Sequence, residues 1–118
     1  MGSKIITASN ISTALNQYDI IILDFWASWC GPCKVFGPIF DRVAAKNPDI
    51  LFGKVDSEIE HDLCADFEIR SVPTLVILKN QTIILNQAGS VPEYVLDDIV
   101  KKVRELKVED LEEDSGDE

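Results

Sequence analysis

An almost unbroken apolar run at 20–27 constrains the fold of this chain more than any other feature of its sequence. Successive residues of a strand point to opposite faces, so a run without polar alternation is typical of a central strand that is covered on both faces. The run is far too short to cross a bilayer, which takes about 20 apolar residues, and we expect no membrane span. We therefore predict an α/β domain in which helices cover both faces of a sheet.

The rest of the chain alternates between short β-rich runs and longer stretches with helical spacing. We predict strands over 5–7, 20–27, 50–55, 74–78 and 82–85, and helices that start near 9, 33, 57 and 90. Long connections make the first three strands parallel, whereas the short loop at 79–81 makes the last two an antiparallel hairpin. The predicted architecture is a mixed five-stranded sheet, three parallel strands plus the hairpin, with four helices on both faces.

Individual residues indicate where the predicted helices begin and which side they bury. Ser57 and Ser90 each precede a glutamate by three positions, which is the pattern of a capping box. The helix that starts near Ser57 would turn Ile59 and Leu63 inward. Pro38 should kink the helix that follows the central strand.

Most of the formal net charge of −10 lies at the C-terminal end of the chain. Residues 108–118 hold seven acidic side chains and no basic one, a composition that cannot bury enough apolar surface to offset chain entropy. We expect one domain over 1–107 and a disordered acidic tail over 108–118, which either keeps the protein in solution or docks to a basic partner. The acidic balance also argues against nucleic-acid binding.

The N-terminal residues and the cysteine count bear on the compartment. Residues 1–4 are polar, and Ile5 and Ile6 are too few for the apolar core of a secretory signal. Three cysteines are an odd number, which does not suit the disulfide scaffold of a secreted domain. We expect a monomer in the cytoplasm.

Cys30 and Cys33 are spaced for redox chemistry, with Gly31 and Pro32 between them. They follow the central strand and open a helix, at the sheet edge where α/β proteins place their sites. Unpaired N–H groups and the helix dipole at a helix N-terminus favour the thiolate of Cys30, the form that attacks disulfides. Pro32 stiffens the first turn without losing a hydrogen bond. We predict thiol–disulfide exchange in which Cys30 attacks and Cys33 then displaces the substrate.

A zinc half-site is the alternative interpretation of the cysteine pair. His61 and Cys64 could supply two further ligands, but the spacing fits no common zinc pattern. We therefore predict no metal site.

Asp24 is the one charged residue within the apolar run. Alternation along a strand places it on the same face as Ile22 and Trp26, so we expect its carboxyl to be buried. Burial raises the pKa of a carboxyl, which would suit Asp24 to proton transfer near neutral pH.

The segment WCGPCK at 29–34 resembles the active-site motif of the thioredoxin family. The similarity extends from about residue 5 to 107 and includes, in order, DFWA at 24–27, Pro38, KVD at 54–56, IRSVPT at 69–74 and Gly89. The resemblance implies the thioredoxin fold and a protein disulfide reductase, a dithiol electron carrier with a reversible Cys30–Cys33 disulfide. Two alternatives stay open: a disulfide isomerase or oxidase of the same fold, and a redox-sensitive binding module.

The resemblance also implies roles for residues outside the cysteine pair. Asp24 would act as a base toward Cys33 through water, with Lys54 nearby, and a cis Val72–Pro73 peptide would lie beside Cys30. The residues implied to tune the pair are Gly31, Pro32, Trp29 and Pro73, and those implied to form an apolar substrate groove are Trp29, Val72, Pro73 and Gly89.

Partners follow from the same resemblance. No cofactor is expected to be bound, because thioredoxin reductase would supply the electrons and consume NADPH itself. The implied clients are disulfide-containing proteins such as ribonucleotide reductase, peroxiredoxins and methionine sulfoxide reductase.

Four residues test how far the resemblance holds. Glu68 stands where thioredoxins usually have glycine, and Gln81 replaces the glycine of the usual hairpin turn, which leaves the turn type open. Cys64, where alanine is common, is either a small core residue or a regulatory thiol. His61 falls on the polar side of its helix and is expected at the surface.

Overall fold

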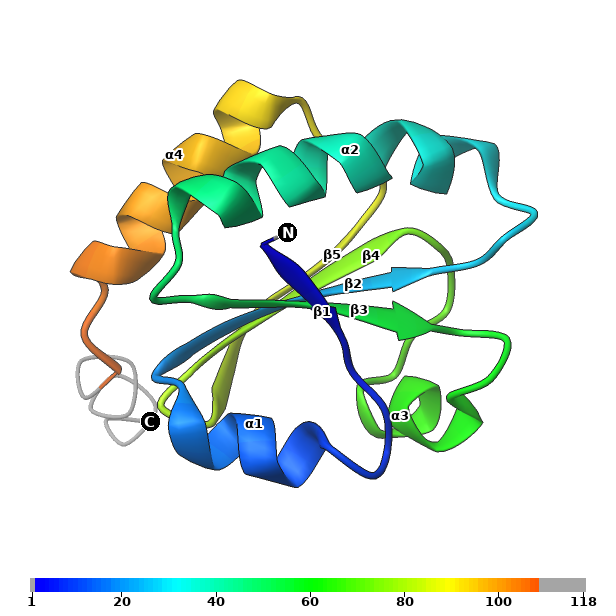
Figure 1. The fold of residues 1–118 in the computed structure, drawn as a ribbon, viewed down its shortest axis with the longest axis horizontal. Coiled ribbons are helices and arrows are strands. Elements are labelled where there is room, and N and C mark those ends of the chain that lie inside the picture. The colour runs from blue at the N-terminus through cyan, green and yellow to red at the C-terminus, as the bar shows by residue number, and fades with distance from the viewer. Residues whose placement is uncertain (1, 109–118) are drawn as a thin grey trace, which may run out of the picture.

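The computed structural model describes residues 2–108, which form a mixed sheet between two layers of helices (Figure 1). The elements in chain order are β1 (Ser3–Ile5), α1 (Ile11–Gln17), β2 (Ile20–Trp26), α2 (Gly31–Lys46), β3 (Leu51–Asp56), α3 (His61–Asp66), β4 (Thr74–Lys79), β5 (Thr82–Ala88) and α4 (Glu93–Glu105). The strand order is β1-β3-β2-β4-β5, with β1, β3 and β2 parallel and with β4 and β5 antiparallel to their neighbours. The predicted architecture is confirmed, although β1 lies earlier in the chain than the predicted 5–7.

The described residues extend one position into the predicted acidic tail. Val108, the first residue of the predicted acidic tail, is buried. The remainder of that tail, 109–118, lies outside the described residues. Within residues 2–108, no helix combines the length and the apolar composition needed to cross a membrane.

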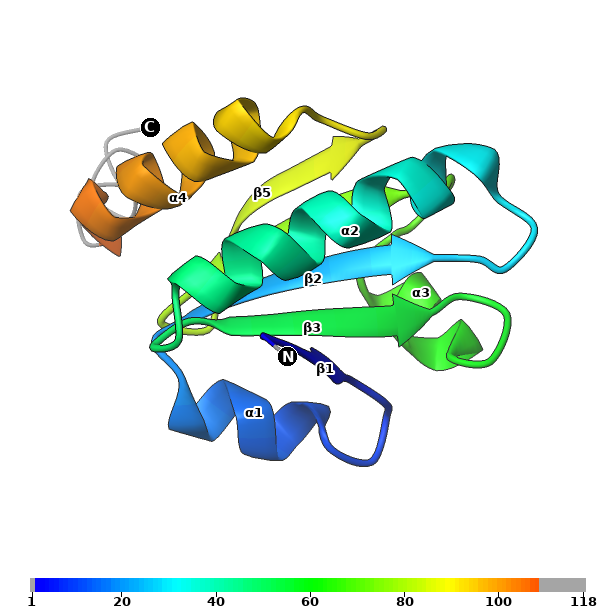
Figure 2. The ribbon, with the colours of Figure 1, turned by 45° about the horizontal axis from the view of Figure 1, so that its top comes forward.

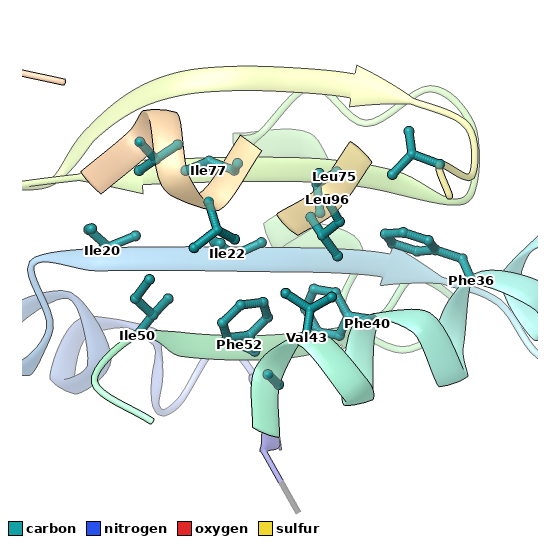
Figure 3. Close-up of a cluster of buried hydrophobic side chains, with 14 residues drawn as sticks. Ile20, Ile22, Phe36, Phe40, Val43, Ile50, Phe52, Leu75, Ile77 and Leu96 are labelled. Carbon is teal, nitrogen blue, oxygen red and sulfur yellow. The ribbon is translucent and has the colours of Figure 1, made fainter. Parts of the chain in front are cut away.

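The central strand β2 is buried because its side chains alternate between two apolar clusters. Helices α2 and α4 cover one face of the sheet, and α1 and α3 cover the other (Figures 1 and 2). Ile22 packs with Phe40 and Phe52 in the cluster beneath α2 and α4 (Figure 3). Leu23 and Phe25 belong to the cluster on the opposite face. The interpretation of 20–27 as a doubly covered strand is therefore confirmed.

The predicted capping box at Ser57 is wrong. Helix α3 begins only at His61, with Glu60 as its N-cap residue and no side-chain cap. The Ser57 hydroxyl instead donates a hydrogen bond of 2.8 Å to the Trp26 carbonyl at the end of β2. Ile59, expected to point inward, is 70% exposed. A partner from a distant part of the chain thus replaces the local cap, because a serine hydroxyl bonds any backbone group within its reach.

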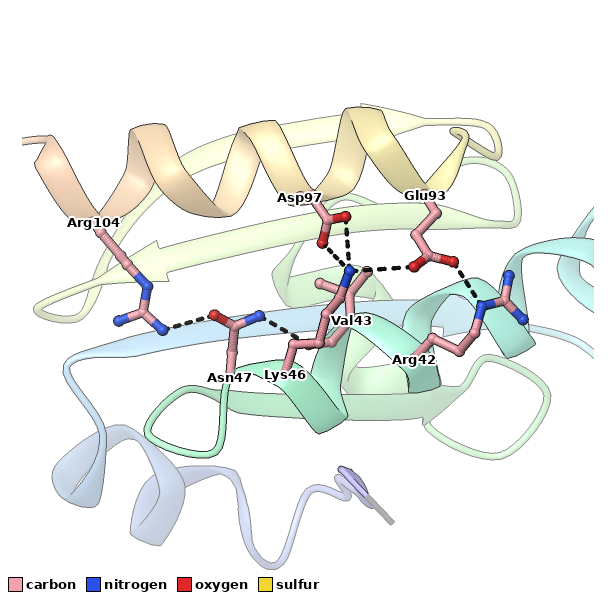
Figure 4. A network of polar contacts seen from close by, with 7 residues as sticks. All are labelled: Arg42, Val43, Lys46, Asn47, Glu93, Asp97 and Arg104. Atoms are coloured by element: carbon pink, nitrogen blue, oxygen red, sulfur yellow. Dashed lines mark hydrogen bonds and ion pairs between the residues drawn. The ribbon is translucent and has the colours of Figure 1, made fainter.

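The second predicted capping box, at Ser90, is also wrong, because the Glu93 side chain bonds residues of another helix instead of the start of its own. Helix α4 begins at Glu93 and has no side-chain cap. The Glu93 carboxylate accepts hydrogen bonds from Arg42 (2.6 Å) and Lys46 (3.2 Å) of α2, and Lys46 also bonds Asp97 at 2.8 Å (Figure 4). Exposed ion pairs of this kind contribute under about 1 kcal/mol each. Their arrangement joins α4 to α2, the helix that carries both cysteines.

The hairpin turn between β4 and β5 needs no glycine. Asn80 and Gln81 have φ values of 51° and 66°, which is the left-handed conformation that a two-residue type I′ turn requires. The Gln81 side chain donates a hydrogen bond of 3.2 Å to the Leu15 carbonyl in α1. This contact helps to offset the backbone cost of a residue with a side chain at that position.

Glu68 occupies a left-handed position at the end of α3. Its φ is 55°, its N–H bonds the Ala65 carbonyl, and the Ile69 N–H bonds the Cys64 carbonyl. These two bonds define a Schellman motif, which places glycine at this position most often. The departure from the thioredoxin pattern therefore falls where a side chain is conformationally unfavourable.

Replacing Glu68 with glycine is expected to stabilise the protein by about 0.5–1 kcal/mol, because relief of left-handed strain exceeds the added chain entropy of glycine. Urea unfolding followed by circular dichroism measures the change. Gly89→Ala is the matched control, since Gly89 has a φ of 99° and alanine there should lower stability. A Glu68→Gly variant with a lower unfolding midpoint would contradict the strain argument.

Candidate active site

Cys30 lies just before α2, in the segment that follows β2, and Cys33 lies in the first turn of α2. Cys30 is the N-cap residue of α2, and the backbone N–H of Cys33 donates a hydrogen bond of 3.1 Å to the Cys30 sulfur. The two cysteines form a disulfide, and their Cα atoms are 5.3 Å apart. Gly31 and Pro32 occupy the first turn, where the lack of an N–H on proline leaves no partner unsatisfied.

The surroundings of Cys30 favour a negative charge on its sulfur. The sulfur sits at the positive end of the α2 dipole and accepts a backbone hydrogen bond. No acidic residue occupies the first turn of α2. Both cysteines are almost buried, with 3% of Cys30 and 6% of Cys33 exposed. In the reduced protein the same groups would stabilise the thiolate that attacks disulfides.

Apolar side chains pack against the cysteine pair. Val72 packs against the pair, and its carbonyl oxygen lies 3.6 Å from the Cys30 sulfur. The Val72–Pro73 peptide is cis, as the resemblance implies, and the Gly89 N–H donates a hydrogen bond of 2.8 Å to the Pro73 carbonyl. Trp29 is 71% exposed and shares a hollow of about 270 Å³ with Val72. Cys30 therefore lies next to Val72, which shares with the exposed Trp29 ring a hollow that Arg70 and Ser71 also line.

Asp24 is buried without a hydrogen-bond partner for one carboxylate oxygen. Only 1% of the residue is exposed, and its Oδ1 atom contacts no donor among residues 2–108. Burial raises the pKa of Asp24 to about 7, while the positive charge of Lys54 lowers it and the negative charge of Asp41 raises it. The carboxyl therefore changes charge near neutral pH, as predicted for a buried aspartate at this position.

A cavity of about 480 Å³ connects Asp24 with Cys33. Asp24, Cys33, Asp41 and Lys54 all line it. Most of the cavity wall is apolar, but the charged side chains of Asp24, Asp41 and Lys54 give water partners there, and water can carry a proton between groups that do not touch. Lys54 is the neighbour of Asp24 on the adjacent strand, but its ion pair, of 3.6 Å, is with Asp41. Asp24 and Lys54, which the resemblance implies as site residues, thus line one cavity together with Asp41, which it does not include.

Asp41 could have been found from the sequence. Cys33, Gly37 and Asp41 are spaced four residues apart, so they lie along one side of the helix. Once Cys33 is placed in a site, this spacing extends the site to Asp41. The signal was weak because an acidic residue at a helix surface usually only contacts solvent.

The remaining cysteine and the histidine lie in α3. Cys64 is partly buried against the cluster on the α1 and α3 face. Burial raises the pKa of its thiol, and the charges of Glu60 and Asp56 raise it further. His61 is exposed, and its Nε2 atom lies 2.9 Å from the Glu58 carbonyl. In the part of the chain from 2 to 108, no three His, Cys, Asp or Glu side chains are placed to hold a metal ion.

Two cysteines that join at a helix N-terminus can exchange their disulfide with that of another molecule, which is the chemistry of thiol–disulfide oxidoreductases.

Comparison with known proteins specifies the family. The thioredoxin family model matches residues 2–102. The chain is 37% identical to a thioredoxin of Mycoplasmoides gallisepticum, over 69% of this chain and 81% of that protein. It is also 37% identical to thioredoxin-1 of Caenorhabditis elegans, over 71% of this chain and 73% of that protein. A solved structure of Plasmodium falciparum thioredoxin superposes with a TM-score of 0.77 at 28% identity, covering 84% of this chain and 97% of the other.

The chain belongs to the thioredoxin family. It is a disulfide reductase that works through its Cys30–Cys33 disulfide. Members of the family bind no cofactor, so electrons pass through the two sulfurs alone. Family membership also implies two kinds of partner, a reductase that restores the dithiol and client proteins that carry disulfides.

Proposed function

We propose that each side chain of the site has a distinct step in client reduction. The Cys30 thiolate attacks one sulfur of the client disulfide and forms a mixed disulfide, while the other client sulfur leaves as a thiolate and takes a proton from water. Cys33 then attacks the Cys30 sulfur. The Cys30–Cys33 disulfide forms, the second client thiolate leaves and is protonated, and two electrons have passed to the client.

Asp24 is the proton acceptor for Cys33. The observation that carries this assignment is the unpartnered, buried oxygen of Asp24, a residue that lines the same cavity as Cys33. The proton on the Cys33 sulfur moves through water to the Asp24 carboxylate, and the Cys33 thiolate forms as it attacks. Lys54 contributes a positive charge beside Asp24 that favours the ionised, proton-accepting form.

The apolar surface beside Cys30 docks the client. Trp29 offers an exposed ring in the hollow that it shares with Val72, and the buried Pro73 that follows Val72 accepts a hydrogen bond from the Gly89 N–H. An extended client segment would pair with backbone groups of Val72 and bury the Trp29 ring, which brings its disulfide to the Cys30 sulfur. The shallow shape suits many client sequences because it selects little beyond an apolar, extended segment.

The identity of the partners is a further part of the proposal. Thioredoxin reductase would return electrons from NADPH, and ribonucleotide reductase, peroxiredoxins and methionine sulfoxide reductase are the clients that the family suggests. The cytoplasm is the proposed compartment, because a reductase needs a thiol-reducing environment to stay in its dithiol form. We further propose that the domain ends near 107 and that the acidic tail follows it.

Replacing Cys33 with serine is expected to trap clients on Cys30. Serine cannot displace the client from the mixed disulfide, so the covalent complex should persist until a reducing agent is added. Non-reducing gel electrophoresis after reaction with a disulfide-bonded client measures the trapped fraction. A Cys33→Ser variant that releases its client as fast as the unchanged protein would contradict the division of roles between the two cysteines.

A further inference from the structure

Asp41 holds the position closest to the charge of Lys54. Its Oδ1 atom lies 3.6 Å from the Lys54 ammonium and accepts a hydrogen bond of 2.7 Å from the Ser3 hydroxyl in β1. The ammonium lies over Gly37, since a side-chain carbon added there would sit 3.5 Å from it. Lys54 therefore reaches across the cavity to α2, where Asp41 and Gly37 receive its head group.

The same ammonium is within the electrostatic range of Asp24 and yet makes no ion pair with it. Asp24 and Lys54 face each other on adjacent strands β2 and β3. Among residues 2–108 no basic side chain lies within 4.0 Å of the Asp24 carboxylate, and its Oδ1 atom accepts no hydrogen bond. Two carboxylates thus share one nearby cation, and the more exposed of the two holds it.

The other charged groups around Asp24 cannot take over this function. The titratable side chains that line the cavity with Asp24 are Cys33, Lys34 and Asp41 from α2 and Lys54 from β3. On its other side, Asp24 pairs across the sheet with Leu75 of β4, which carries no charge. Of these groups, Lys54 and Asp41 are the ones whose charges shift the pKa of Asp24, and the ion pair with Asp41 holds the Lys54 ammonium in its position.

We propose that Asp41 is a positioning residue for the proton transfer from Cys33: by pairing with Lys54 it keeps the ammonium away from Asp24 and leaves the Asp24 carboxylate free to accept the proton. This inference rests on the proposed role of Asp24. In the step concerned, the S–H bond of Cys33 breaks, its proton passes through water to Asp24, and the Cys33 sulfur keeps the electron pair with which it attacks Cys30. If Lys54 paired directly with Asp24, that carboxylate would be a weaker base.

Two titrations of the oxidised and reduced full chain test the proposal. The carboxyl carbon of Asp24, observed by ¹³C NMR in the oxidised protein, reports its protonation directly. Release of the second thionitrobenzoate from the reduced protein after reaction with Ellman's reagent reports the attack by Cys33. In Asp41→Asn, both midpoints should fall by about half a pH unit, because one like charge is lost and Lys54 is free to approach Asp24. Unchanged or raised midpoints overturn the proposal, and so does a fall in the NMR midpoint alone.

Matched variants separate the action of Asp41 through Lys54 from a general effect of charge. Asp98→Asn removes one acidic group and one exposed ion pair, with Lys102, on α4, and should leave both midpoints unchanged. In a Lys54→Met background the Asp41→Asn shift should shrink to less than half, because no cation remains to be released. An undiminished shift there shows that Asp41 acts by its own charge and overturns the positioning role.

A final variant keeps the failure of this inference distinct from the failure of the proposed function. Asp24→Asn should remove the Asp24 ionisation from the pH profile of the second thionitrobenzoate release. If that profile is unaltered, Asp24 is not the proton acceptor, and the proposed function fails together with the inference. If Asp24→Asn alters the profile and Asp41→Asn does not, the role of Asp24 stands and only the role of Asp41 is overturned.

Discussion

Replacing Cys30 with serine is expected to reduce the disulfide reductase activity to the background rate of the chemical reductant. A serine hydroxyl stays protonated at neutral pH and cannot form the mixed disulfide, so Cys33, which is almost buried behind it, has nothing to resolve. Precipitation of insulin in the presence of dithiothreitol measures the activity. Cys33 is the remaining thiol of the pair, and with 6% of its surface exposed it is poorly placed to attack a client disulfide.

Cys64→Ala is the control for this prediction, because it also removes one thiol and introduces the residue that is common in the family. It should retain most of the activity, since Cys64 lies in α3 and its thiol resists ionisation through burial. Insulin reduction by Cys30→Ser at a rate clearly above that of dithiothreitol would disprove the assignment of the nucleophile.

Replacing Asp24 with asparagine is expected to stabilise the oxidised protein strongly at alkaline pH. The pKa of Asp24 is raised from 3.8 to about 7, so the folded state holds a proton there that the unfolded state releases. The charged form is therefore unfavourable in the folded state, and its cost grows as the pH rises from about 4 to 7 and is complete above 7. With about 1.4 kcal/mol per pKa unit, the full cost is about 4 kcal/mol.

Urea unfolding of both proteins at pH 5 and pH 8 checks this prediction. The free energy of unfolding of Asp24→Asn should exceed that of the unchanged protein by about 2–3 kcal/mol more at pH 8 than at pH 5. An equal difference at both pH values would mean that Asp24 has an ordinary pKa in the folded protein. The expected gain in stability at a group proposed to carry protons is the usual conflict between stability and activity.

Strand periodicity predicted the part of the site that belongs to the sheet. Alternation along 20–27 correctly placed Asp24 on the face of Ile22, because a strand buried on both sides leaves a side chain only two directions. The cysteine pair was equally predictable, since its spacing and its position after a strand are both local features. Sequence reasoning is reliable where neighbouring residues alone determine the geometry.

The incorrect predictions concern contacts between residues that are far apart in the sequence. Ser57 and Glu93 were expected to cap helices, but Ser57 bonds the end of β2 and Glu93 bonds basic residues of α2. The spacing of Asp41 from Cys33 indicates the site, but its ion pair with Lys54 was missed because Lys54 lies on a strand that the helix only reaches in the folded protein. In each case a polar side chain bonds a residue far along the chain. Patterns of neighbouring residues in the sequence do not identify such partners.

The sulfur of Cys30 has two functions at once, because it is both the redox atom and the N-cap acceptor of α2. Folding and reduction form a closed thermodynamic cycle, so any preference of the cap for a thiolate over a disulfide sulfur appears in full in the redox equilibrium. For a two-electron couple, about 1.4 kcal/mol of such preference moves the potential by about 30 mV. The reducing power of the protein is thus partly a property of how its second helix begins, and changes to that first turn can adjust it without touching either sulfur.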